Sequence, residues 1–93
     1  MIEPSVKTAI LKVLHEQLAG IGFEHAEILE SQDHYGDPIL RIVIVYKKVG
    51  AEVDPSPTFS LARYVKEAIR PLGEERFPHF QHRFPEDQDF KAA

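Results

Sequence analysis

The residues that could do chemistry in this chain are five histidines, a turn rich in aspartate and a pair of adjacent glutamates. His79 and His82 are three positions apart, which in a strand places them on opposite faces and makes them poor joint metal ligands. Asp33, His34 and Asp37 share one turn and offer oxygen and nitrogen ligands to a cation. Aspartate is also a common turn former. Because a metal site needs converging ligands with support behind them, we predict no metal site.

The residue spacing gives little support for catalysis. The chain has no cysteine, which excludes thiolate chemistry and disulfide bonds. No serine lies in a Gly-x-Ser-x-Gly elbow. Glu74 and Glu75 are adjacent in a polar connection, where a solvated role is the simpler interpretation. We therefore predict that the chain is not an enzyme and has no catalytic residues and no cofactor. The sequence identifies no small-molecule substrate.

Three basic residues suggest an alternative chemistry, contact with phosphates. Arg63, Lys66 and Arg70 recur at i, i+3 and i+7 on a predicted helix. The chain carries a net charge of −4, of which residues 85–93 contribute −2 with three acids and one base, leaving −2 for the rest. A mildly acidic body argues against general nucleic-acid binding. A solvated helix face is the commoner role for such a stripe, and RNA binding through it is the alternative.

Five elements must position these side chains. The apolar spacing, the strand-like runs and the turn residues predict two helices, Pro4–Ala19 and Thr58–Leu72, and three strands, Phe23–Gln32, Ile39–Tyr46 and Phe77–Phe84. The most apolar strand, 39–46, should lie in the middle of the sheet. The predicted fold is α+β, a two-layer α-β-β-α-β arrangement with two helices packed on one face of a three-stranded mixed sheet. Residues 1–84 form the single domain, and residues 85–93 an acidic, flexible tail.

The pairing of the first two strands decides which side chains share a sheet face. One register matches charge with charge and apolar with apolar across the hairpin, pairing Glu30 with Arg41, Ile28 with Val43 and Ala26 with Val45. A slip by one residue pairs Ile28 with Ile42 or Ile44 instead. We prefer the first register.

In that register an apolar patch lies on the sheet face away from the helices. Its apolar members are Ala26, Ile28, Val43 and Val45, and Glu30 and Arg41 fix the register. Such a patch commonly marks an interface. The tail folding back over it, or shading by the stems of Glu24, Arg41 and Lys47, are the alternatives. We predict a non-enzymatic protein-interaction module that forms a homodimer or pairs with a partner protein.

Two resemblances add expectations. The element order, the hairpin segment Gly36–Arg41 and the helix Thr58–Leu72 resemble the N-terminal domain of the ribosome maturation factor family, RimP. That resemblance implies two helices on a three-stranded sheet and work on the small ribosomal subunit. The segments Asp37–Leu40, Val53–Pro55, Leu72–Pro78 and His82-x-Phe84 resemble short bacterial proteins, some of which look like partners in toxin–antitoxin-like pairs. This second resemblance implies an antitoxin-like binding role.

The expected location is the cytoplasm of a bacterium. No apolar run approaches the roughly 18–20 residues that span a bilayer. The residues after Met1 lack the basic region and apolar core of a signal peptide. We expect no membrane contact.

Overall fold

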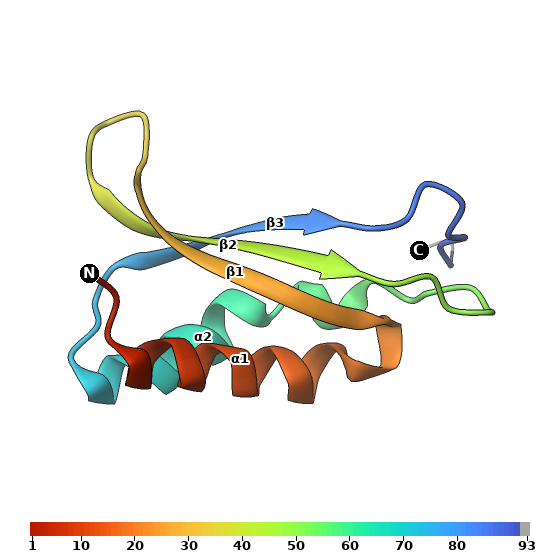
Figure 1. Ribbon diagram of the computed structural model, residues 1–93, viewed down its shortest axis with the longest axis horizontal. Coiled ribbons are helices and arrows are strands. Elements are labelled where there is room, and N and C mark those ends of the chain that lie inside the picture. The colour runs from red at the N-terminus through yellow and green to blue at the C-terminus, as the bar shows by residue number, and fades with distance from the viewer. Residues whose placement is uncertain (92–93) are drawn as a thin grey trace.

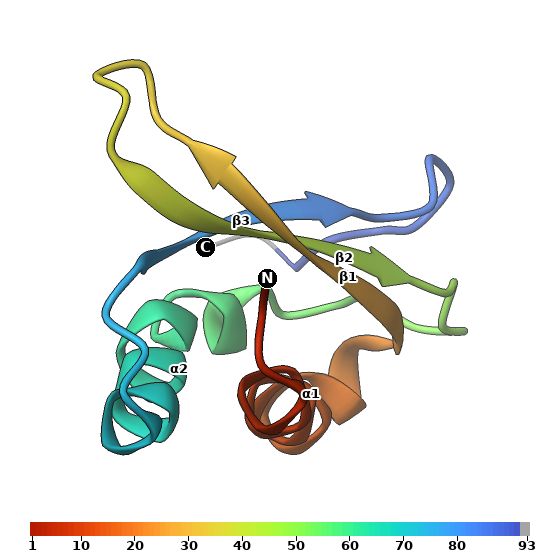
Figure 2. The ribbon, with the colours of Figure 1, turned by 60° about the vertical axis from the view of Figure 1, so that its left-hand side comes forward.

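The computed structural model describes residues 1–91 and shows two helices beneath a three-stranded sheet (Figure 1). The elements are α1 (Pro4–Leu18), β1 (Phe23–Gln32), β2 (Pro38–Tyr46), α2 (Leu61–Ile69) and β3 (Phe77–Arg83), with 3-10 turns η1 (Ala19–Ile21), η2 (Ser56–Thr58) and η3 (Arg70–Leu72). The strand order is β1-β2-β3, with β1 antiparallel and β3 parallel to β2. Both helices lie on the same side of the sheet (Figure 2). The predicted α+β fold is confirmed.

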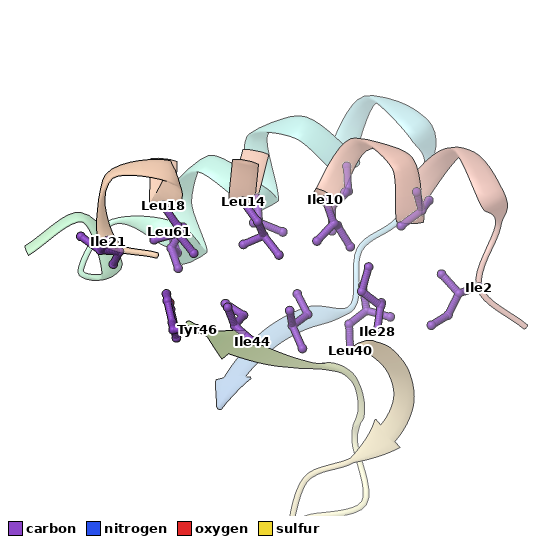
Figure 3. Packing of buried hydrophobic residues seen from close by; sticks show 14 of the residues in the cluster. Ile2, Ile10, Leu14, Leu18, Ile21, Ile28, Leu40, Ile44, Tyr46 and Leu61 are labelled. Carbon is purple, nitrogen blue, oxygen red and sulfur yellow. The ribbon is translucent and has the colours of Figure 1, made fainter. Parts of the chain in front are cut away.

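Helix α1 forms because its apolar side chains recur every four residues. Val6, Ile10, Leu14 and Leu18 are buried along one stripe, and Pro4 occupies the first turn, where its missing N–H costs no hydrogen bond. The stripe faces the sheet, as the close view of the core shows (Figure 3).

Gly22 joins α1 to β1 at a point that needs glycine. Its φ is +90°, and a Cβ at this position would lie 2.5 Å from the carbonyl oxygen of Lys47. The Gly22 carbonyl also accepts a hydrogen bond from the Lys47 backbone N–H at 2.8 Å. Because both the dihedral angle and the close approach exclude a side chain, this residue fixes where β1 begins beside the end of β2.

Strand β2 is the centre of the core. Leu40, Ile42, Ile44 and Tyr46 all face the helices and are buried. Figure 3 shows Leu40, Ile44 and Tyr46 between the strands and the two helices. The buried cluster is completed by Ile2, Val6, Ile10, Leu14, Leu18, Ile21, Ile28, Val53, Leu61, Val65 and Ile69.

The preferred register of the hairpin was wrong by one residue. Ile28 pairs with Ile42, Ala26 pairs with Ile44, and Glu30 pairs with Leu40. Cross-strand charge pairs are worth about 0.2–1 kcal/mol each, whereas burying an isoleucine side chain is worth about 1.5–3 kcal/mol. Burial of Ile28 under the helices therefore outweighs the charge matching. An irregularity between Phe23 and His25 lets Phe23 pack against the same core.

Helix α2 begins later than the sequence predicts. Residues 56–58 form a separate 3-10 turn, so the buried stripe consists of Leu61, Val65 and Ile69. The apolar spacing within the predicted helix Thr58–Leu72 puts Phe59 on one buried stripe with Ala62, Val65, Ile69 and Leu72. Instead, Phe59 lies in the turn before α2 and is 76% exposed. Leu72, at the other predicted end of the stripe, is also exposed because it follows the helix in η3.

Residues 85–91 of the predicted flexible tail make specific contacts with the loop after β2, contacts that the sequence prediction missed. Gln88 is buried; its Oε1 accepts a hydrogen bond from the Val49 N–H at 2.7 Å, and its Nε2 donates to the Ala51 carbonyl at 2.7 Å. The Val53 N–H donates to Asp89, and the Lys91 N–H donates to Val53, forming a short parallel bridge. The remaining tail residues, 92–93, lie outside the described residues.

Replacing Ile28 tests the register directly. Ile28→Ala should lower the free energy of unfolding by about 2–5 kcal/mol, because it leaves a cavity under the helices. Leu29→Ala, its neighbour on the other face, should cost less than about 1 kcal/mol. Urea unfolding measures both; equal effects of the two substitutions would contradict the register.

Gln88 tests whether the tail stabilises the domain. Gln88→Ala should lower the free energy of unfolding by about 1–3 kcal/mol, since it leaves a backbone N–H and a carbonyl without partners. The matched control is Glu86→Ala, an exposed tail residue, which should change it by no more than about 0.5 kcal/mol. Chemical unfolding curves that superimpose for the two variants would show that the tail contacts add nothing.

Candidate functional site

The sheet has one face that no helix of residues 1–91 covers (Figures 1 and 2). We call it the open sheet face. The pairing of the strands arranges its side chains in four rows: Ser31–Ile39–Phe77, Leu29–Arg41–His79, Glu27–Val43–Gln81 and His25–Val45–Arg83. Each row runs from β1 across β2 to β3. The face is therefore apolar along part of its central strand and mixed in charge on its edges.

The structure divides the predicted interface residues between the two faces. Arg41, Val43 and Val45 lie on the open sheet face, as predicted. Ala26 and Ile28 face the helices and pack in the core, so their assignment to the patch was wrong. The one-residue change of register is the reason, because it turns every side chain of β1 to the opposite face.

The apolar surface that is still accessible on the open sheet face lies largely at its edges. Val43, at its centre, is only 7% exposed, because Glu27 and Gln81 flank it. Leu29 on β1 is 45% exposed and Phe77 on β3 is 49% exposed. Sequence reasoning missed both residues, although the slipped register would have placed Leu29 opposite Arg41.

Glu30, the predicted partner of Arg41, belongs to a different group of charges. Its carboxylate contacts the Met1 amino group and the Arg76 guanidinium. Arg76 also forms an ion pair with Glu74 at 2.7 Å. The hydrogen bond from Arg76 holds the pKa of the Glu74 carboxyl below its usual value. These contacts join the start of β3 to the end of β1, so Glu30 has a structural role here.

The predicted basic stripe lies on the outer side of α2. Arg63 and Arg70 are exposed, Lys66 is partly exposed, and none of the three is in an ion pair within residues 1–91. The Lys66 ammonium lies 4.8 Å from the centre of the Phe77 ring, a cation–π distance. Two shallow hollows of about 270 Å³ each adjoin the stripe and share Lys66 and Arg70. The spacing of these residues in the sequence thus correctly placed them together.

The Asp33–Asp37 turn uses its first carboxylate for its own backbone. Asp33 Oδ1 accepts hydrogen bonds from the N–H groups of Tyr35 and Asp37 at 2.9 and 3.0 Å. Within residues 1–91, no group of three or more histidine, cysteine, aspartate or glutamate side chains is arranged to hold a metal ion. The turn-forming role of Asp33 accounts for its place in the sequence.

Tyr46 and His82 form a polar pair inside the aromatic edge of the core. The Tyr46 hydroxyl and His82 Nδ1 share a hydrogen bond at 2.8 Å, and the Tyr46 ring stacks on Phe84 with centroids 4.0 Å apart. Burial raises the pKa of the Tyr46 hydroxyl and lowers the pKa of His82. Since Tyr46 is itself buried, this hydrogen bond gives its hydroxyl a partner where β2 packs against β3.

Comparison with known proteins adds no relative: no protein family, curated protein or solved structure matches this chain. Neither helix in residues 1–91 is long and apolar enough to cross a membrane. Residues 1–91 form a small α+β domain in which one face of the sheet is not covered by either helix.

The half-buried His82 predicts a loss of stability in weak acid. Because its pKa in the folded protein is below the ordinary 6.5, the unfolded chain binds the proton more tightly. The contribution of neutral His82 is complete above about pH 6.5 and is lost as the pH falls toward its lowered pKa. The difference between the free energies of unfolding at pH 7.5 and pH 5.5 should be smaller in His82→Asn. The matched control is His25→Asn on exposed β1; an identical effect of the two substitutions would contradict the assignment.

Proposed function

We propose that this domain is a protein-interaction module that self-associates through the open sheet face. The observation that carries the proposal is the position of both helices on one side of the sheet, which leaves Leu29, Val45 and Phe77 accessible on the other (Figure 2). Exposed apolar surface beside charged residues is typical of interaction sites. The described part of the tail, residues 85–91, contacts the loop at 48–53, which leaves this face available to a second molecule.

A second copy is favoured because adjacent rows of the face have opposite charge. Arg41 gives one row a positive charge, and Glu27 gives the next row a negative one. Consider two copies with their open sheet faces together, related by a two-fold axis that runs parallel to the sheet and perpendicular to the strands, between these two rows. This axis would set the Arg41 row over the Glu27 row of the other copy. The same operation would set Ile39 against Val45 of that copy. A surface that is complementary to itself in this way suits an isologous dimer.

The size of the face predicts a weak association. Three strands about 4.8 Å apart and four rows about 7 Å apart give roughly 400 Å² for each partner. A stable interface buries about 800 Å² for each partner. We therefore expect a reversible dimer that forms at high micromolar concentration and dissociates on dilution.

Val43→Lys is the first test. A lysine at the centre of the face introduces a charge that a second sheet would have to bury, so dimer formation should weaken by at least about tenfold. Sedimentation equilibrium between about 10 μM and 1 mM measures the association, and circular dichroism verifies the fold. Val43→Ile is the matched control and should keep the dimer. A monomeric wild-type protein at 1 mM would overturn self-association and favour a partner of different sequence, as an antitoxin-like role requires.

Charge exchange tests the arrangement of the two copies. Glu27→Arg and Arg41→Glu should each weaken the dimer, because each places like charges opposite one another. The double variant should recover most of the wild-type affinity. If each single variant weakens the dimer but the double variant is weaker still, the proposed two-fold arrangement is wrong while the use of the face is not.

A further inference from the structure

We propose that the outer surface of α2 binds the backbone and bases of single-stranded nucleic acid. The surface comprises Phe59, Arg63, Lys66, Arg70 and Phe77, and we call it the α2 surface. Residues 59–70 contain three bases and one acid, a net charge of +2, whereas the chain as a whole carries −4. The segment is therefore locally positive, whereas the rest of the sequence carries −6.

The three basic side chains are available for phosphate. In residues 1–91 none of them forms an ion pair, whereas the nearby Arg76 is already held by Glu74 and Glu30. Arg63 and Arg70 are seven residues apart, which is about 10 Å along a helix. That length suits contact with two or three consecutive phosphates.

Two aromatic rings accompany the bases. Phe59 precedes the helix and is 76% exposed, and Phe77 is half exposed with the Lys66 ammonium over its ring. Exposed rings beside a basic groove are the usual means of holding unstacked bases. Phe59 lies outside the predicted core stripe, so packing in the core does not explain a phenylalanine at this position.

The shape of the surface is consistent with an extended ligand. The two hollows beside the stripe share Lys66 and Arg70 in their walls, so a ligand in either hollow contacts these two bases. Glu67 lines one hollow, and Glu74 and Glu75 line the other. Their negative charge opposes a polyanion and limits the affinity, so the binding should be weak and strongly dependent on salt.

The other charged partner to consider for such a surface is an anionic membrane. Membrane-surface helices insert a broad apolar face. In α2 the apolar stripe of Leu61, Val65 and Ile69 is buried in the core, and the outer side offers bases with a single aromatic residue before them. Duplexes keep their bases stacked and would not use the rings. These features favour a single strand.

Binding of a fluorescein-labelled 12-nucleotide oligouridine, followed by anisotropy between 20 and 200 mM NaCl, tests the proposal. Three phosphate contacts predict a slope of about −2 for log affinity against log salt concentration. Lys66→Gln with Arg70→Gln should reduce the slope to about −0.7. Phe59→Ala should weaken binding about tenfold with the slope unchanged, as loss of one stacked base predicts. Lys7→Gln with Lys12→Gln, on exposed positions of α1, is the matched control and should change neither quantity.

Several results would overturn the proposal. They are no binding at 20 mM NaCl, equal losses in the α2 and α1 double variants, tighter binding of a duplex of the same length, and binding of phosphatidylserine vesicles in place of the oligonucleotide. Circular dichroism of each variant verifies that it is folded. Phe77 borders both the α2 surface and the open sheet face. Because Val43 belongs to the open sheet face alone, the Val43→Lys variant should bind the oligonucleotide like the wild type, which separates this binding from self-association.

Discussion

Burial of the β2 side chains beneath the two helices is the constraint on which the rest of the structure depends. Leu40, Ile42, Ile44 and Tyr46 face the helices and leave almost no surface to solvent. Once this set is buried, the register of β1 follows, because Ile28 joins the same core through its pairing with Ile42. Burial in the core, and not charge pairing between the strands, therefore sets the register of the hairpin. The residues on the open sheet face follow from that register.

Much of the fold could be predicted from the sequence because its signals are strong and local. The four-residue spacing from Val6 to Leu18 predicts α1, and the β-branched run at 39–46 predicts a central strand. The parallel pairing of β2 and β3 follows from a helix between them. The tail contacts could not be found this way, because they depend on one glutamine, Gln88, meeting backbone groups of a loop about 39 residues earlier.

The site was harder to predict because a shift of one residue in the pairing of β1 with β2 changes which β1 side chains lie on the open sheet face. Val43 and Val45 were placed correctly from alternation within β2. Ala26 and Ile28 were not, since comparing cross-strand pairs overvalued charge matching relative to burial. On α2 the bases were placed correctly by their spacing. Phe59 was misplaced, because the sequence does not show that a separate turn at 56–58 delays the start of the helix.

The central claim is that a second copy occupies the open sheet face, and methyl NMR spectra recorded from about 50 μM to 1 mM test it most directly. Association through this face predicts concentration-dependent shifts for the methyl groups of Leu29, Val43 and Val45. The methyl groups of Leu72, exposed beyond the end of α2, should stay unchanged. Spectra that do not change up to 1 mM, or shifts centred on Leu72, would contradict the claim.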